Sequence, residues 1–192
     1  MPLPAPLKSL MSAMHRPVYE RRLRVLVDAI APHLRAGDRV LDVGCGNGTL
    51  GKALLDDAAR RGLAGVAAER VKRGGEPIPV IAFDGKAIPA PDGAYDVVIL
   101  ADVLHHEEDP DRLIAECRRV SRRLLIIKDH VLQGPLARAR VSFMDWAANA
   151  PYGVPCLYRY NTPAQWRAQR DRHALRPVEE RLRMHLYPAG WN

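Results

Sequence analysis

The sequence has no apolar run that approaches the roughly 18 residues of a membrane-spanning helix. Its first 17 residues, MPLPAPLKSLMSAMHRP, lack the continuous apolar centre of a secretory signal peptide. Cysteine is scarce: Cys45, Cys117 and Cys156 are an odd number with wide, unequal spacing, which fits neither a disulfide framework nor a zinc site. We therefore expect a cytoplasmic protein with reduced, unmetallated thiols.

The length and composition are those of an ordinary globular protein. The chain has 192 residues, of which 47% are apolar and 27% charged, so we expect one domain over residues 1–192. The net charge is +7, and 24 of the 29 basic residues are arginines scattered through both halves of the chain. This scatter favours a coding bias over a binding face for nucleic acid.

Short apolar runs alternate with amphipathic stretches along the first two thirds of the chain. The runs are RVLDV (39–43), GVAA (65–68), PVIAF (79–83), DVVIL (96–100) and LLIIK (124–128). Such runs are typical of strands covered on both faces of a parallel sheet. Helical spacing or start signals predict helices over 15–34, 50–61 and 110–121, and one from Thr162 onward. The expected fold is α/β, Rossmann-like and doubly wound, with a mostly parallel sheet and helices on both faces.

Glycines follow the first apolar run at every second position. In VLDVGCGNGTL the acidic Asp42 precedes Gly44, Gly46 and Gly48. A strand that passes through such a loop into a helix brings bare backbone against a ligand, with the helix N-terminus behind it. The dinucleotide fingerprint G-x-G-x-x-G would need glycine at position 49, where this chain has Thr49. The loop therefore indicates a nucleotide-type site of another kind.

Two stretches carry a resemblance to a known family. VLDVGCGNG resembles the first motif of the class I S-adenosylmethionine-dependent methyltransferases. AYDVVILADVLHHEEDPDRLIAECRRV (94–120) resembles the pattern around the fourth strand of their small-molecule members of the methyltransferase-11 type, which methylate quinones and sterols. The similarity covers residues 40–128. It implies S-adenosyl-L-methionine as cofactor, with Asp42, Gly44 and Gly46 holding its methionine and sugar parts.

Further cofactor contacts follow from the same resemblance. Glu69, at the end of the second strand, is expected to accept the ribose hydroxyls, although the family more often has aspartate there. Asp84 and the flexible Gly85 follow the third strand and are expected near the adenine amino group. Ala101, at the end of the fourth strand, is assigned to the cofactor site as well. Tyr19 in the N-terminal helix is expected to close over the carboxylate of the cofactor.

The candidates for proton transfer follow the fourth and fifth strands, where open α/β sheets carry their reactive groups. His130 follows the fifth strand beside Asp129, and such a pair suits a general base with an orienting partner. His106, after His105 at the fourth strand, either supports its loop or acts as the base. Asp102 and Asp129 could approach a divalent ion, but no third oxygen ligand presents itself, so no metal is expected.

The resemblance also frames the organisation of the domain. We expect a helical lid over 1–38, a cofactor-binding core over 39–130, an aromatic-rich cap on the substrate side over 131–170, and a C-terminal strand over 171–192. Within the cap, the tyrosines are the better pocket candidates and the tryptophans the better candidates for packing.

The predicted function is methyl transfer to an oxygen, nitrogen or carbon of a small molecule, such as one of secondary metabolism. Two alternatives stay open: a non-catalytic, cofactor-binding subunit of another enzyme, suggested by the short C-terminus, and a nucleic-acid methyltransferase. The second is disfavoured because the adenine-amino type needs N/D-P-P-Y/F where this chain has ADVL (101–104). The acceptor, the methylated atom and the choice between homodimer and partner subunit are not determined by the sequence.

Overall fold

The computed structural model describes residues 5–44, 46–59, 62, 64–69, 78–82, 85–150 and 153–186. The chain divides into two compact units. One is continuous, Leu26–Asp129, and the other combines Met1–Val25 with His130–Asn192. The continuous unit contains the end of the N-terminal helix as well as the sheet, and the expected division into lid, core, cap and C-terminal strand stays a prediction.

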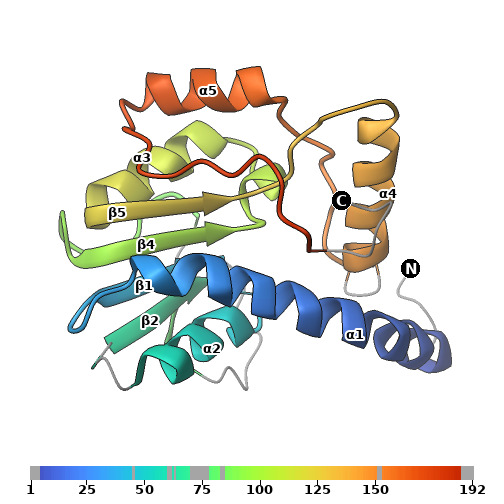
Figure 1. Ribbon diagram of the computed structural model, residues 1–192, viewed down its shortest axis with the longest axis horizontal. Helices are drawn as coiled ribbons and strands as arrows, with labels where there is room; N and C mark the ends of the chain where they lie inside the picture. The colour runs from blue at the N-terminus through green and yellow to red at the C-terminus, as the bar shows by residue number, and fades with distance from the viewer. Residues whose placement is uncertain are drawn as a thin grey trace. The chain divides into compact units, whose positions relative to one another are not determined.

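A parallel sheet forms the centre of the continuous unit (Figure 1). Its strands are β1 (Arg39–Val43), β2 (Ala64–Glu69), β3 (Val80–Ala82), β4 (Tyr95–Ala101) and β5 (Ser121–Lys128). They lie in the order β3-β2-β1-β4-β5, and all four pairings are parallel. All five predicted strands are confirmed. The order reverses between β1 and β4, so the crevice of such a sheet opens at their carboxyl ends.

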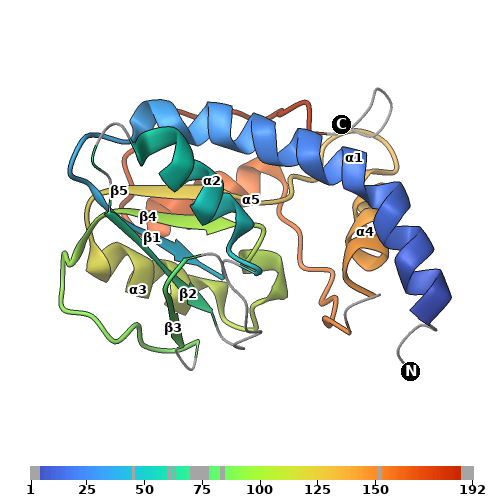
Figure 2. The same cartoon turned by 90° about the horizontal axis from the view of Figure 1, so that it is seen from below.

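Helices cover both faces of this sheet. Figure 2 shows α2 (Thr49–Ala58) on one face and α3 (Pro110–Val120) on the other. The predicted cap of α3 is confirmed, because the Asp109 side chain accepts a hydrogen bond of 3.0 Å from the Arg112 amide. The doubly wound architecture expected from the sequence is therefore present.

The α2 face of the sheet holds a continuous apolar cluster. Its buried members come from the end of the first helix and the residues just after it, from α2 and from two strands: Ile30, Ala31, Leu34, Val40, Leu54, Val97 and Ile99. Val40 and Val97 are register partners on β1 and β4, so they present to the same face. Burial of this kind stabilises by about 25 cal/mol per Å² of apolar surface, which fixes the two strands that carry the site.

The N-terminal helix is longer than its spacing predicted. Helix α1 runs from Ala5 to Ile30 and is followed by the short 3-10 helix η1 (Ala31–His33). Pro17 therefore lies inside the helix instead of in its first turn. The sequence argument was wrong at this end, because a proline removes one helical hydrogen bond but does not prevent a long helix from continuing through it.

The second unit contains α4 (Ala137–Asn149) and α5 (Pro163–Arg172). Thr162 and Gln165 form the reciprocal capping box of α5, as the Thr-Pro start signal predicted. The expected C-terminal strand does not form over residues 178–186, which are irregular. Leu182, Met184 and Leu186 alternate as in a strand, but a strand also needs a hydrogen-bonded neighbour.

No helix in the described part of the chain combines the length and apolar character needed to cross a membrane.

Candidate functional site

The glycine loop (residues 43–49) joins β1 to α2 and adopts the backbone that its sequence predicts. Gly44, Gly46 and Gly48 all have positive φ, at 69°, 59° and 72°. A Cβ at Gly44 would lie 2.6 Å from Cγ2 of Val103, so the backbone there packs directly onto the segment after β4. A Cβ at Gly46 would meet no described atom within 4 Å. The loop thus needs glycine for two different reasons, a close contact at Gly44 and an open approach at Gly46.

The start of α2 shapes the end of this loop. Oδ1 of Asn47 accepts hydrogen bonds from the Thr49 amide at 3.2 Å and from its hydroxyl at 2.7 Å. Gly48 is the left-handed N-cap residue of the helix. Asp42, on β1, is 3% exposed. A buried carboxylate beside an open backbone cradle at a helix N-terminus fits a polar, nucleoside-type cofactor.

The chain after β4 turns sharply at Asp102. This residue has φ 58°, and its amide donates a hydrogen bond of 2.8 Å to the Lys128 carbonyl at the end of β5. The Lys128 ammonium is ion-paired with the Asp102 carboxylate. Left-handed backbone at a non-glycine residue costs about 1–2 kcal/mol and is found at functional sites, where the surrounding structure enforces it. The 3-10 helix η3 (Leu104–His106) follows directly.

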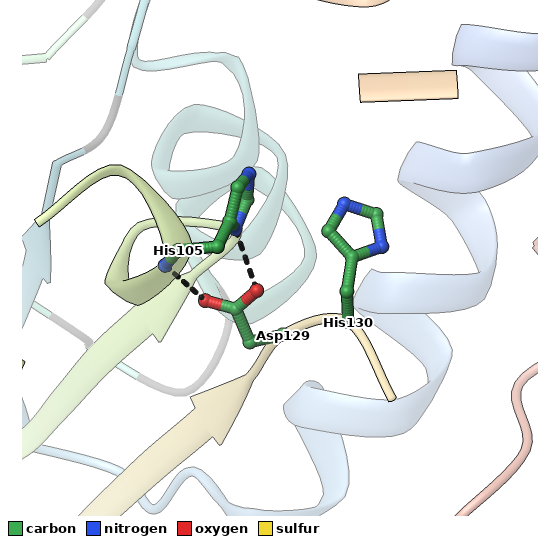
Figure 3. Close-up of side chains that lie close together, drawn as sticks. All are labelled: His105, Asp129 and His130. Atoms are coloured by element: carbon green, nitrogen blue, oxygen red, sulfur yellow. Dashed lines mark hydrogen bonds and ion pairs between the residues drawn. The ribbon is translucent and has the colours of Figure 1, made fainter. Parts of the chain in front are cut away.

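Asp129 is the residue that fixes this histidine-bearing turn (Figure 3). Its Oδ2 accepts hydrogen bonds from the amides of Leu104 at 2.8 Å and His105 at 3.3 Å. Its Oδ1 lies 2.6 Å from Nδ1 of His105, and the side chains of His105 and Asp129 are 3% and 2% exposed. One carboxylate from the residue after β5 therefore caps η3 and orients the imidazole that η3 carries.

The ring of His106 lies tilted against the imidazole that Asp129 holds. The ring centroids of His105 and His106 are 4.0 Å apart, with the planes at 43°. His106 is half-buried, whereas His105 is buried. The two histidines thus have different surroundings: the inner one is fixed by a carboxylate, and the outer one is partly exposed.

His130, the first candidate for a base, belongs to the second unit. Its ring packs edge-on against Tyr160, with centroids 5.5 Å apart, and its carbonyl accepts a hydrogen bond of 3.0 Å from Nε1 of Trp166. The Asp129 carboxylate is hydrogen-bonded to His105, and its expected role in orienting His130 stays a prediction. A role of His130 in proton transfer stays a prediction.

The structure describes the remaining cofactor candidates to different extents. Glu69 is the last residue of β2, paired with Ala82 of β3, and its side chain lies outside the described atoms. Asp84 lies outside the described residues, and Gly85 has φ 76°. Ala101 ends β4 and packs against the α2-face cluster. Tyr19 lies in the second unit and is 48% exposed.

Sequence reasoning placed His105 beside His106 but missed its contact with Asp129, and it missed Val103 altogether. The sequence signal for His105 was present: a histidine after one strand and an aspartate after the adjacent strand are brought to one edge by a parallel sheet. Val103 carries no chemical signal, and only the tertiary structure shows its contact with Gly44. Together these contacts join the glycine loop and the histidine turn into one site at the carboxyl ends of β1, β4 and β5.

The sheet order, the glycine loop and the polar edge define the chain as a Rossmann-like nucleoside-cofactor protein. A comparison with protein families matches residues 14–172 to the methyltransferase domain family. The chain belongs to this family. The expected class, a class I S-adenosylmethionine-dependent methyltransferase with S-adenosylmethionine as cofactor, is thereby confirmed.

Curated relatives agree with this assignment at low identity. The ubiquinone/menaquinone biosynthesis C-methyltransferase of Ralstonia pickettii is 27% identical over 174 residues, which cover 82% of this chain and 68% of the relative. Its counterpart in Bordetella avium is 28% identical over 169 residues, 80% of this chain and 60% of the relative. This chain thus spans roughly two thirds of the length of these relatives.

Solved structures support the fold. The 1,6-didemethyltoxoflavin-N1-methyltransferase of Burkholderia thailandensis, solved with its substrate and S-adenosylhomocysteine, aligns with a TM-score of 0.62 at 18% identity, covering 94% of this chain and 84% of that one. A SAM-dependent methyltransferase from Aquifex aeolicus aligns with a TM-score of 0.60 at 18% identity and covers 88% of each chain. At this identity the likeness shows the Rossmann-like fold alone.

Proposed function

We propose that the chain transfers the methyl group of S-adenosylmethionine to an ionisable group, above all a hydroxyl, of a small molecule, and that His106 of η3, supported by His105, takes the proton of the acceptor. One observation carries the proposal. The backbone of Gly44 in the glycine loop packs on Val103, two residues before His105, so the cofactor loop and the imidazoles share one sheet edge.

The residues of the loop fit the cofactor. The open space at Gly46, the N-terminus of α2 and the buried Asp42 supply a backbone cradle with one carboxylate. We expect Glu69 to hold the ribose hydroxyls from the end of β2, by the logic of nucleotide sites in this kind of sheet. S-adenosylmethionine supplies an already activated methyl group, so the work of the protein is alignment, exclusion of water and removal of one proton.

The two histidines divide the acid–base task. His106 is the partly exposed ring, which makes it the one that an acceptor can contact, and we assign the proton transfer to it. His105 is a positioning residue: Asp129 fixes its Nδ1, and its ring in turn supports that of His106. Asp129 acts through both and need not touch the acceptor. This assignment keeps His106 and Asp129 from the sequence prediction and gives His105 a positioning role.

Calorimetric titration with S-adenosylhomocysteine tests the cofactor part. We expect the wild-type chain to bind and Gly46→Ala to weaken binding by about 10-fold or more, since the new methyl group occupies the open cradle. Gly62→Ala is the matched control, because Gly62 also has positive φ (68°) and open space for a Cβ. Absence of binding by the wild-type chain, or equal losses in both variants, would contradict the proposal.

A second titration addresses the ribose contact, using Glu69→Ala and Glu69→Asp. We expect the alanine variant to lose most of its affinity and the aspartate variant to retain part of it, since aspartate is the more common residue in the family. Binding unchanged in Glu69→Ala would remove this residue from the site.

A further inference from the structure

We propose that Lys128, the last residue of β5, is a positioning residue of the cofactor site and acts through Asp102. Its ammonium holds the turn after β4, and this turn keeps Val103 packed against Gly44 of the glycine loop. The inference rests on the proposed function, which places S-adenosylmethionine in that loop. It assigns the cofactor side of the sheet edge to Lys128 and leaves the histidine side to Asp129, the next residue in the chain.

Lys128 contacts Asp102 at two points. The two residues meet because β4 and β5 are parallel neighbours, and Ala101, which precedes Asp102, is the register partner of Lys128. The Lys128 carbonyl accepts a hydrogen bond of 2.8 Å from the Asp102 amide, and the Lys128 ammonium is ion-paired with the Asp102 carboxylate. The backbone and the side chain of Lys128 therefore hold both the amide and the carboxylate of Asp102.

Asp102 depends on such support because its backbone is strained. Its φ is 58°, in the left-handed region that residues with a side chain rarely adopt. A conformation of this kind persists where the surrounding contacts enforce it. Lys128 supplies two of these contacts, and the ion pair is the one that a change of its side chain removes.

The strained turn determines where the next side chain lies. Val103 is bonded directly to Asp102 and is 8% exposed. A Cβ at Gly44 would lie 2.6 Å from Cγ2 and 2.9 Å from Cγ1 of Val103, so both methyl groups lie against the backbone of the glycine loop. Close-packed interiors transmit small displacements, because they contain few voids that could absorb them. A shift of Asp102 would therefore move Val103 and alter the backbone around Gly44.

The ion pair between Lys128 and Asp102 has little contact with solvent. The two side chains are 11% and 18% exposed. A pair in such surroundings is screened only weakly by salt, and loss of one partner leaves the other charge in a poorly solvated place. The pair between Arg122 and Asp96 joins the same two strands at their amino ends, and Arg122 is 62% exposed. It provides a matched comparison, because it links the same strands far from the glycine loop.

Asp129 holds a different part of the same turn. Its carboxylate accepts hydrogen bonds from the amides of Leu104 and His105 and contacts the His105 ring, whereas the Lys128 ammonium pairs with Asp102. Two consecutive residues thus hold opposite ends of the short segment 102–105. We therefore expect separate effects of their substitution, on cofactor affinity for Lys128 and on the tautomer of His105 for Asp129.

Calorimetric titration of S-adenosylhomocysteine into Lys128→Met tests the proposal, since methionine keeps an unbranched side chain without the charge. We expect the affinity to fall by about 10-fold, and Asp102→Asn to lower it by at least about 3-fold. The double variant should lose no more than Lys128→Met alone, because two side chains that act as one unit are not additive. Arg122→Met is the matched control and should bind like the wild-type chain. Unchanged affinity in Lys128→Met, or losses that add in the double variant, would overturn the proposal.

Long-range ¹⁵N NMR spectra separate this positioning role from a general folding defect. We expect Lys128→Met to show the same His105 tautomer as the wild-type chain, since Asp129 is intact in this variant. A Lys128→Met chain with a lowered melting temperature and a changed tautomer would be generally disturbed, and Asp102→Asn, which preserves the shape of the side chain, would then decide. Lowered affinity with an unchanged tautomer in Asp102→Asn would support the proposal, and any other result would overturn it.

The wild-type titration distinguishes this inference from the proposed function. A wild-type chain that does not bind S-adenosylhomocysteine would remove the proposed function and this inference with it. A wild-type chain that binds, with weaker binding in Gly46→Ala but unchanged binding in Lys128→Met, would overturn the role of Lys128 and leave the proposed function in place.

Discussion

The carboxylate of Asp129 holds the imidazole of His105 from the adjacent strand end, with Oδ1 2.6 Å from Nδ1 and both side chains at least 97% buried. The same carboxylate caps the turn that carries His105 through two backbone amides. A carboxylate that binds Nδ1 favours the tautomer with its proton on Nδ1. The pair thus fixes both the place of the ring and the position of its proton.

Asp129→Asn should remove the preference of His105 for the Nδ1-protonated tautomer, while it preserves the shape of the side chain at position 129. We expect long-range ¹⁵N NMR spectra to show a single His105 tautomer, protonated at Nδ1, in the wild-type chain and a mixture in the variant. With an acceptor in hand, kcat should fall by about 10- to 100-fold and the affinity for S-adenosylhomocysteine should stay unchanged. Asp96→Asn, at the amino end of β4, is the control and should change neither the tautomer of His105 nor kcat. An unchanged tautomer and kcat in Asp129→Asn would contradict the positioning role.

Gly44→Ala should destabilise the fold through two separate causes. The new Cβ would lie 2.6 Å from Cγ2 of Val103, and φ of 69° strains any L side chain. We expect a loss of about 2–4 kcal/mol in the free energy of unfolding, measured by urea titration. The double variant Gly44→Ala/Val103→Ala should recover only the steric part, relative to Val103→Ala alone. Recovery of the whole loss would show that the backbone conformation contributes nothing.

Glu116 should give a pH-dependent contribution to stability. The hydrogen bond from Arg119 and the amide of Ile88 lower the pKa of its carboxyl from the ordinary value of 4.5, against the opposing effect of burial. A lowered folded-state pKa means that the unfolded chain protonates first as the pH falls. The contribution is therefore complete above pH 4.5 and is lost as the pH falls through the folded-state pKa.

Urea titrations of the wild-type chain and of Glu116→Gln measure this effect. At neutral pH we expect the variant to be less stable by about 1–2 kcal/mol, since it loses a charge-assisted hydrogen bond to Arg119. The difference should shrink steadily below pH 4.5. A difference that grows on acidification would contradict the assigned direction of the pKa.

Tyr160→Phe should be costly, because it removes the 2.6 Å hydrogen bond that the Tyr160 hydroxyl donates to the buried Asp145 carboxylate. Burial, assisted by Asp145, also raises the pKa of the Tyr160 hydroxyl, so this group stays a donor throughout the ordinary pH range. We expect the variant to lose about 1–3 kcal/mol of stability in urea titrations. Tyr158→Phe is the matched control and should change stability by less than about 0.5 kcal/mol, because Tyr158 is 41% exposed.

The parallel sheet could be predicted because each strand is recognisable from its own local sequence. RVLDV and DVVIL are apolar almost throughout, and the Asp109-Pro110 pair marks the start of α3 before any tertiary contact is known. The C-terminal strand failed for the opposite reason. Alternation at Leu182, Met184 and Leu186 is a local property, whereas a strand depends on a partner whose position the local sequence does not specify.

The aromatic residues reversed part of the expectation. Tryptophans were assigned to packing and tyrosines to a pocket, yet Trp146 is 48% exposed, and Tyr160 is 4% exposed and hydrogen-bonded to Asp145. Both residue types combine an apolar body with a polar end, so composition alone cannot assign them. The place of each side chain in the structure and the hydrogen-bond partner of its polar atom decide whether it is buried or exposed.

The sequence by itself determined the order of strands and helices, the glycine loop and the family of cofactor, because these depend on short motifs and on the spacing of apolar residues. The tertiary structure decided which histidine Asp129 holds, why Gly44 tolerates no side chain, and which aromatic rings reach the surface. These are relations between residues far apart in the chain. They exist only when β4 and β5, or α4 and the segment after it, lie side by side, and no local pattern encodes that distance.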